Sequence, residues 1–153
     1  MIIRPATKFD SPKVLSMIKS FSEQNSMPDQ LANDILDFNY IGSLFQHIIL
    51  GGGVLLVAEK NNEVVGFIIG MKNNNVWYPN QITLNELMIW VEPKFRNGRA
   101  AYLLLKEYNK EAESMRQQKQ ITMYTMTKTK HFAQINFEKF GYSKIEETWA
   151  VGA

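Results

Sequence analysis

The chain has 153 residues and a net charge of +2; 45% of its residues are hydrophobic and 21% are charged. This balance predicts one globular domain over residues 1–153 and disfavours a general binder of polyanions. The absence of cysteine excludes disulfides, thiolate zinc sites and a cysteine nucleophile.

The N-terminal half of the chain predicts a strand, two helical regions and a hairpin. Its start lacks the layout of a secretory signal, and no apolar run approaches the roughly 20 residues that span a bilayer, so we expect a cytoplasmic protein with no membrane partner. The expected elements are a strand at residues 2–3, a helix from Ser11-Pro12 through Phe21, a helical region from near Pro28 that continues, broken, to Ile48, and strands 54–59 and 64–71 joined by Asn61-Asn62.

The C-terminal half continues the alternation of strands and helices. The expected elements are a polar loop at 72–80, a long strand at 82–91, a helix with its apolar stripe at Ala101, Leu104, Leu105, Tyr108 and Ala112, a strand at 121–126, a short helix at 131–140 that stops at Gly141, and a strand at 142–151. Strands and helices in this order predict an α/β (α+β) fold, a mixed sheet flanked by helices.

Charge is distributed unevenly along the chain. No lysine or arginine lies between Ser20 and Leu50, a stretch that carries four acidic residues. Between Lys94 and Lys130, nine basic residues stand against three acidic ones. The first segment suits a cationic ligand and the second suits phosphates; the alternative is that most of these charges lie on solvated helix faces.

A basic turn between the long strand and the following helix is a candidate anion site. Pro93 ends the strand, residues 94–99 form the turn, and the helix opens on the small residues Ala100 and Ala101. The first amides of a helix lack intrahelical partners and its dipole favours negative charge, so a diphosphate fits here, with charge-assisted contacts from Arg96 and Arg99. The alternative is a tight turn with incidental arginines.

The order and spacing of these residues resemble the GNAT superfamily of acyltransferases. Its signature, a strand ending Val-x-Pro-x-aromatic, then Arg or Gln, two residues, Gly, one residue and Gly or Ala, is matched at Val91, Pro93, Phe95, Arg96 and Ala101. The resemblance extends over the opening 2–6, the hairpin and the segment 133–142. It implies a mostly antiparallel sheet and the use of acetyl-CoA as cosubstrate.

The resemblance also implies which residues hold the cosubstrate. In the family, the strand before the turn splays from its neighbour, and its free amides bind the pantetheine arm and the thioester carbonyl. Carried over by position, the cofactor-binding residues would be Ile89, Trp90, Val91, Arg96, Asn97, Gly98, Arg99, Ala100 and Ala101.

Two positions depart from the family's pattern. Arg99 replaces the first glycine of the signature, and Gly98 precedes it; a similar Arg-Ala pair occurs in phage-type relatives, so we expect CoA binding to be kept. Phe137 stands where many relatives have the tyrosine that protonates the departing thiolate. A phenyl ring has no proton to donate, so another acid is required. Tyr124 is the candidate; the alternatives are that Tyr124 is only a core or pocket-wall residue and that solvent or the ammonium formed in the reaction protonates the thiolate.

Glu86 is the candidate general base. In strict alternation it shares one face of the long strand with Leu84, Met88 and Trp90. A carboxylate on a largely apolar face is expected to have a raised pKa, which suits a group that removes the proton of an amine. The alternatives are a structural Glu86 paired with a lysine or a backbone amide, or a one-residue register shift at a bulge that puts Asn85 in its place.

The sequence therefore predicts an N-acetyltransferase that uses acetyl-CoA in a ternary complex, with a small molecule or a protein as the amine acceptor. A non-catalytic CoA-binding or protein-interaction module is the alternative, supported by Phe137. A nucleic-acid partner is disfavoured because charge is low and aromatics are not interleaved with the basic stretch. No motif for a metal is present, and a homodimer is considered because relatives are often dimers.

Overall fold

The computed structural model of the protein describes residues 1–24, 37–128, 135–147 and 151. Its strands are β1 (Ile2–Pro5), β2 (Gly53–Lys60), β3 (Glu63–Asn74), β4 (Ile82–Val91) and β5 (Met123–Thr125), and its helices are α1 (Ser11–Gln24), α3 (Phe38–His47) and α4 (Ala100–Gln117). Short helical turns lie at Lys8–Asp10, Ile48–Gly52, Pro93–Phe95 and Phe137–Phe140.

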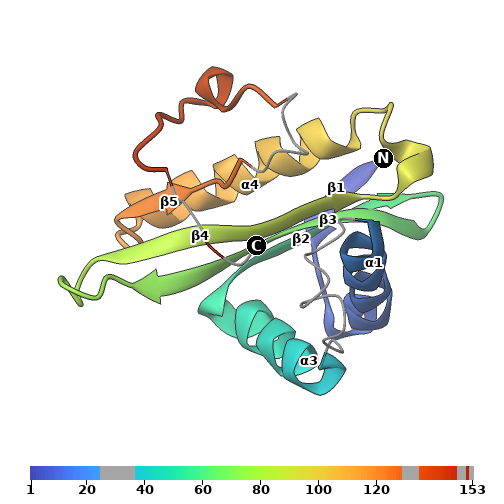
Figure 1. The fold of residues 1–153 in the computed structure, drawn as a ribbon, viewed down its shortest axis with the longest axis horizontal. Helices are drawn as coiled ribbons and strands as arrows, with labels where there is room; N and C mark the ends of the chain where they lie inside the picture. The colour runs from blue at the N-terminus through green and yellow to red at the C-terminus, as the bar shows by residue number, and fades with distance from the viewer. Residues whose placement is uncertain (25–36, 129–134, 148–150, 152–153) are drawn as a thin grey trace.

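The strands form a single sheet in the order β1-β2-β3-β4-β5, in which β1 to β4 are antiparallel and β5 runs parallel to β4. Helix α4 covers one face of this sheet, and α1 and α3 cover the other (Figure 1). The predicted mixed, mostly antiparallel sheet flanked by helices is confirmed. Within the described part of the chain, no helix is long and apolar enough to cross a membrane.

Two apolar layers hold the helices to the sheet. The layer under α4 includes Leu56, Ile68, Leu84, Leu104 and Tyr108, and the layer under α1 and α3 includes Val14, Met17, Phe45, Val57 and Phe67. Alternate residues of β2 and β3 therefore enter different layers, and both strands read as nearly continuous apolar runs because neither face meets water.

The hairpin of β3 and β4 is longer than predicted. The expected loop at 72–80 begins only after Asn74, because Lys72 to Asn74 continue the ladder opposite Leu84 to Ile82. The Asn75 side chain then accepts hydrogen bonds from the amides of Trp77 and Tyr78, at 2.8 and 3.0 Å. Polar side chains on this stretch suggested a loop, but the ladder needs only backbone groups.

The end of the chain differs most from expectation. Strand β5 is restricted to Met123–Thr125 instead of 121–126, and the described residues of the expected last strand, 142–147, are not in strand conformation. Tyr142 instead packs edge-on against Tyr124, with ring centroids 5.6 Å apart, and Ile145 is exposed. A strand exists only where a neighbour offers a register, and the described sheet offers none here.

Some predictions lie partly outside the described residues. Residues 25–36 hold the expected start of the second helical region, and 129–134 hold most of the expected short helix. What is described of the first is α3, whose N-cap Asp37 accepts from the amide of Tyr40 at 2.9 Å. What is described of the second is a single 3-10 turn at Phe137–Phe140, which ends at Gly141 in the left-handed conformation, as the glycine predicted.

The side chain of Tyr108 on α4 lies directly against Gly70 of β3. A Cβ added at Gly70 would lie 2.3 Å from the hydroxyl oxygen of Tyr108 and 3.0 Å from its Cζ atom. Tyr108 is fully buried, and its hydroxyl has no hydrogen-bond partner among the described residues. The glycine therefore makes room for a buried phenol in the core.

We predict that Gly70→Ala lowers the free energy of unfolding by roughly 1–3 kcal/mol, because the methyl group overlaps the phenol of Tyr108. Tyr108→Phe alone should be neutral or stabilising, because it removes a buried hydroxyl that has no partner. In the Tyr108→Phe background, Gly70→Ala should cost less. Urea unfolding of the four proteins measures this coupling, and an equal cost in both backgrounds would contradict the proposed contact.

Candidate functional site

Strands β4 and β5 separate shortly after they meet. Their ladder joins Thr83, Leu84 and Asn85 to Met123, Tyr124 and Thr125. Thr125 Oγ1 then donates to Asn85 Oδ1 at 2.9 Å. The next polar contact is made by a side chain, since the amide of Thr127 donates to Glu86 Oε2 at 3.1 Å. The carboxylate of Glu86 thus marks the point at which β5 leaves the edge of β4.

A bulge at Leu87 sets which way Glu86 faces. Ile69 of β3 pairs with Met88, but Gly70 pairs with Glu86, so β4 has one extra residue. The expectation that Glu86 shares a face with Met88 and Trp90 is therefore wrong. Leu84 packs in the α4 layer and Met88 and Trp90 pack in the layer of α1 and α3, so the bulge reverses the alternation between them.

Beyond the bulge, β4 leaves backbone groups directed away from β3. The amide of Glu92 donates to the carbonyl of Val65 at 2.9 Å, so this amide points toward β3. Amide directions alternate along a strand, so the amide of Trp90, two residues earlier, also points toward β3. The amides of Ile89 and Val91 then point to the side that β5 has left. The carbonyl of Val91 accepts from Arg96 Nε at 2.9 Å.

The two buried carboxylates of the described chain have opposite environments. Asp10 is paired with Arg4 at 2.9 Å, and this hydrogen bond is the largest cause that lowers its pKa to about 2. Glu86 is only 7% exposed and takes part in no ion pair that joins described residues. Burial raises its pKa to about 7, against the smaller opposite effect of the Thr127 amide. Asp10 is structural; Glu86 is poised to exchange a proton near neutral pH.

The turn after β4 leads directly to the first residues of α4. The guanidinium of Arg96 stacks on the ring of Trp90, 4.3 Å from its centroid, and Lys94 lies 5.0 Å from the ring centroid of Phe95. The N-cap Arg99 makes no side-chain capping hydrogen bond. Ala100 is fully buried, and the first amides of α4 have no intrahelical acceptor. Positive charge and helix amides without intrahelical acceptors therefore meet at this end of the β4 edge.

Two tyrosines, Tyr108 and Tyr142, lie near Glu86 on the α4 side, and a third, Tyr124, packs against Tyr142. Burial is the largest cause that raises the pKa of Tyr108 and of Tyr142, and the charge of Glu86 contributes to both. The hydroxyl of Tyr142 donates to Asn109 Oδ1 on α4. Burial is also the largest cause that raises the pKa of Tyr124, and the charge of Glu113, one helical turn further along α4, contributes to it.

Sequence reasoning singled out Tyr124 and missed Tyr142. The left-handed Gly141 and the bond from the amide of Tyr142 to the carbonyl of Phe137, at 3.3 Å, turn the chain back toward α4. Phe137 and Tyr142 pack edge to face, with centroids 5.9 Å apart. The aromatic residue after a helix-ending glycine was the available signal, but it does not reveal where the ring points.

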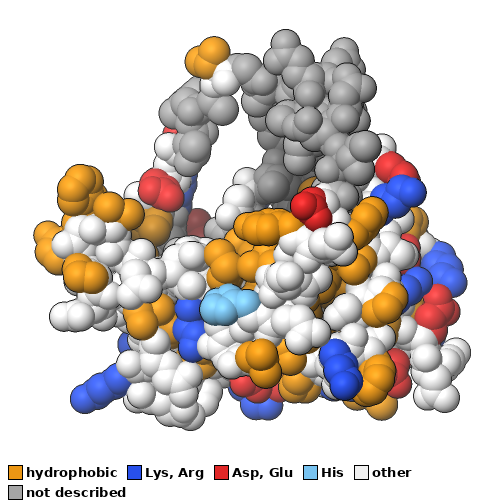
Figure 2. Space-filling view, turned by 90° about the horizontal axis from the view of Figure 1, so that it is seen from below, with side chains coloured by type: hydrophobic (Ala, Val, Ile, Leu, Met, Phe, Trp, Pro, Cys, Tyr) orange, Lys and Arg blue, Asp and Glu red, His pale blue; other side chains and the backbone are white. Residues whose placement is uncertain are grey.

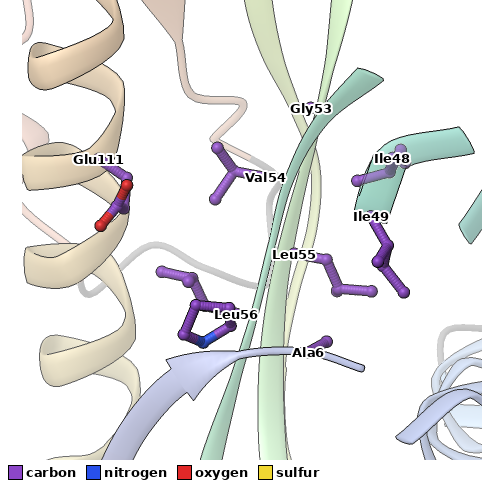
Figure 3. A pocket seen from close by; sticks show the side chains of 9 residues that line it. Ala6, Ile48, Ile49, Gly53, Val54, Leu55, Leu56 and Glu111 are labelled. Atoms are coloured by element: carbon purple, nitrogen blue, oxygen red, sulfur yellow. The ribbon is translucent and has the colours of Figure 1, made fainter. Parts of the chain in front are cut away.

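Other features of the described chain lie away from this site. An apolar cavity of about 150 Å³ opens at the start of β2, beside the end of β1; it is lined by Ile48, Val54 and Leu55, with Glu111 on the α4 side (Figure 3). It is two strands away from β4. On the face that carries α1 and α3, apolar side chains gather near the middle and charged ones are scattered around them (Figure 2). No group of three possible metal ligands occurs in the residues that the structure describes.

Known proteins share this architecture. A family model described as an acetyltransferase (GNAT) domain matches residues 51–144. A predicted acetyltransferase from Clostridium acetobutylicum, solved with acetyl-CoA, is similar with a TM-score of 0.74 and 15% identity, over 99% of this chain and 95% of that one.

Two further solved structures match at similar levels. The ribosomal-protein-alanine N-acetyltransferase from Brucella melitensis biovar Abortus 2308 has a TM-score of 0.68 and 12% identity over 99% of both chains. An aminoglycoside acetyltransferase from an uncultured soil metagenomic sample has a TM-score of 0.66 and 15% identity, over 99% of this chain and 93% of that one. These identities show a shared fold. No curated protein sequence matches the chain.

We predict that Glu86→Gln stabilises the protein at pH 8 and not at pH 4. The pKa of the Glu86 carboxyl is 4.5 in the unfolded chain and about 7 in the folded protein. Its contribution to the free energy of unfolding is therefore complete below the unfolded-state pKa and is lost as pH rises through the folded-state pKa. The gain at pH 8 should approach about 3 kcal/mol. The carbonyl oxygen of the substituted side chain can still accept from Thr127. Chemical unfolding at both pH values measures the difference, and Glu138→Gln, on an exposed carboxylate, is the control that should show none.

Proposed function

The chain belongs to the GNAT acetyltransferase family, and we propose that it transfers an acetyl group from acetyl-CoA to an amine within a ternary complex. The observation that carries this proposal is the opening between β4 and β5. It begins at the buried carboxylate of Glu86 and leads along the amides of Ile89 and Val91 to the basic turn and the start of α4.

The cosubstrate would lie along this opening. A pantetheine arm carries amide groups, and the edge of β4 offers it backbone donors and acceptors that would otherwise need water. A diphosphate at the other end would meet the first amides of α4 and the nearby positive charges. The residues we assign to binding are Ile89, Trp90, Val91, Arg96, Asn97, Gly98, Arg99, Ala100 and Ala101. Of these, Trp90 would act through its ring, which supports Arg96.

The reaction requires little beyond positioning and two proton transfers. Glu86 would take a proton from the amine, directly or through water, because only the neutral amine can attack the thioester carbonyl. The amide bond forms, the carbon–sulfur bond breaks, and the thiol leaves with a proton from an acid. The β4 amides would stabilise the oxyanion that forms between these steps. Tyr124 stays a candidate for the acid, because burial raises the pKa of its phenol and so keeps it protonated at neutral pH.

The acceptor is proposed only by class. Two similar structures are named for acetylation of aminoglycosides and of a ribosomal-protein alanine, which are amines on a small molecule and on a protein. The acidic stretch around Glu23 and Asp37 favours a cationic amine. We further propose that the reaction takes place in the cytoplasm, and a homodimer remains a prediction.

A non-catalytic CoA-binding module of the same fold is the second candidate. Phe137 favours it, because its ring cannot donate a proton. Isothermal titration with acetyl-CoA, followed by a thiol-release assay over a panel of amines, separates the two candidates. Binding with release of thiol supports the enzyme, binding without turnover of any amine supports the module, and the absence of binding contradicts both.

We predict that Glu86→Gln lowers kcat by roughly 10²–10⁴-fold, because the amide cannot accept the amine's proton. The affinity for acetyl-CoA should stay close to that of the wild type. In the wild type, kcat/KM should fall as pH drops below about 7, where Glu86 becomes protonated. That limb should vanish in the variant. Normal turnover by Glu86→Gln would show that another group is the base.

Arg96→Ala should weaken acetyl-CoA binding by about tenfold, equivalent to roughly 1.4 kcal/mol, because it removes a charge and releases the turn from Trp90 and Val91. Lys110→Ala removes an equal charge from an exposed position further along α4 and should leave the affinity unchanged. Titration calorimetry of both variants, with melting temperatures as a check on folding, tests this. Equal affinity in the two variants would contradict the role of Arg96.

A further inference from the structure

Resting on the proposed acetyl transfer, we infer that Tyr142 donates the proton with which the thiol of CoA leaves. The inference comes from the position of its hydroxyl relative to Glu86, to helix α4 and to the separation of β4 and β5. It assigns a catalytic role to a residue in the segment that follows the last described helical turn.

The proposed reaction needs a proton donor on the α4 side of Glu86. When the carbon–sulfur bond breaks, its electron pair passes to sulfur, and the leaving group departs more readily if a nearby acid protonates it. Such an acid must hold its proton at neutral pH and must reach the space between β4 and β5. Three tyrosines of the described chain lie on this side: Tyr108 and Tyr142, whose pKa values the charge of Glu86 raises, and Tyr124, whose ring packs against Tyr142.

The hydroxyl of Tyr108 lies in the closed core. Tyr108 is fully buried, and its hydroxyl oxygen lies against the backbone of Gly70 in the middle of the sheet. A cosubstrate at the outer edge of β4 cannot reach it without displacing β3 or α4. Tyr108 can influence the charge of Glu86 but cannot touch the departing sulfur.

Tyr124 lies in the part of the sheet where the two strands are still joined. It pairs with Leu84, one position before the ladder ends, and the charged side chain that acts most on its hydroxyl is Glu113. Helix α4 runs back from the basic turn, so Glu113 is further from that turn than Asn109 by four residues, or about 6 Å along the axis. Its hydroxyl therefore points away from the opening.

Tyr142 is level with the opening. Its hydroxyl donates a hydrogen bond to Asn109 on α4. The residue before Asn109 is Tyr108, whose phenol lies against Gly70, the residue of β3 that pairs with Glu86. The ring of Tyr142 is held edge-on between Tyr124 and Phe137. It is only partly buried, so a bound molecule can reach it. Burial raises its pKa, which keeps the phenol protonated at neutral pH.

The protons balance over one turnover. Glu86 takes one proton from the ammonium so that the neutral amine can attack, and the nitrogen releases its second proton to solvent as the amide bond forms. Tyr142 gives its phenolic proton to sulfur as the carbon–sulfur bond breaks. The products are the acetylated amine and CoA thiol. The proton on Glu86 then returns to the phenolate of Tyr142, directly or through solvent, which restores both groups without any further reactant.

The test compares matched substitutions in the full-length protein, with an amine that the wild type acetylates. Tyr142→Phe should lower kcat by about 10²-fold with little change in the KM for acetyl-CoA, because the ring and its packing remain. Tyr78→Phe, at the exposed tip of the hairpin, is the control and should keep the wild-type kcat. Tyr124→Phe tests the competing donor and should lose less activity than Tyr142→Phe.

A second measurement separates proton donation from a structural role. Replacing Tyr142 by 3,5-difluorotyrosine keeps the shape of the ring and lowers the pKa of its phenol. The alkaline limb of the kcat profile should therefore move to lower pH, whereas a phenol that only supports packing would not shift it. This variant also keeps the test valid if Tyr142→Phe fails to fold.

An unshifted alkaline limb, wild-type kcat in Tyr142→Phe, or a loss confined to Tyr124→Phe would each overturn the role of Tyr142. In those cases the wild type still transfers acetyl groups, so the proposed function would stand. If the wild type neither binds acetyl-CoA nor acetylates any amine, the proposed function and this inference both fall.

Discussion

The separation of β4 from β5 is the constraint on which the candidate site depends. Three residue pairs join the strands, and then the carboxylate of Glu86 takes the amide of Thr127, which would otherwise continue the ladder. An edge of backbone donors inside a folded domain normally pairs with another strand or is covered. Here the described chain keeps β4 open toward the basic turn, so a ligand with amide groups can complete the sheet.

The carboxylate at the start of this opening, that of Glu86, is unusual because it is buried. Glu86 is buried and joins no ion pair among the described residues, so it favours its protonated form, which opposes folding at neutral pH and suits a group that must accept a proton. Asp10 shows the ordinary solution, because Arg4 lies against it and keeps it charged. The bulge at Leu87 also shapes the site. It turns Glu86 toward α4 and the tyrosines, while Trp90 on the opposite face supports Arg96.

Local patterns predicted the parts of the fold that are fixed by neighbouring residues. The turn at Asn61-Asn62 has both residues at positive φ, Pro93 ends β4, and Gly141 ends a helical turn in the left-handed conformation. Each of these depends on the backbone preferences of one or two residues. The expected strand at 142–151 failed over its described residues because a strand also needs a partner, which alternation of residue types cannot supply.

The sequence by itself determined the class of fold, the position of the basic turn and Glu86 as the acidic residue to consider, because strand ends, glycines and charges are written in consecutive residues. Only the tertiary structure decided which way Glu86 faces, since one extra residue in β4 reverses every later side chain. It alone also brought Tyr142 beside Asn109 and near Glu86. Contacts between residues 33 or more positions apart depend on how the layers pack, and no local pattern encodes that distance.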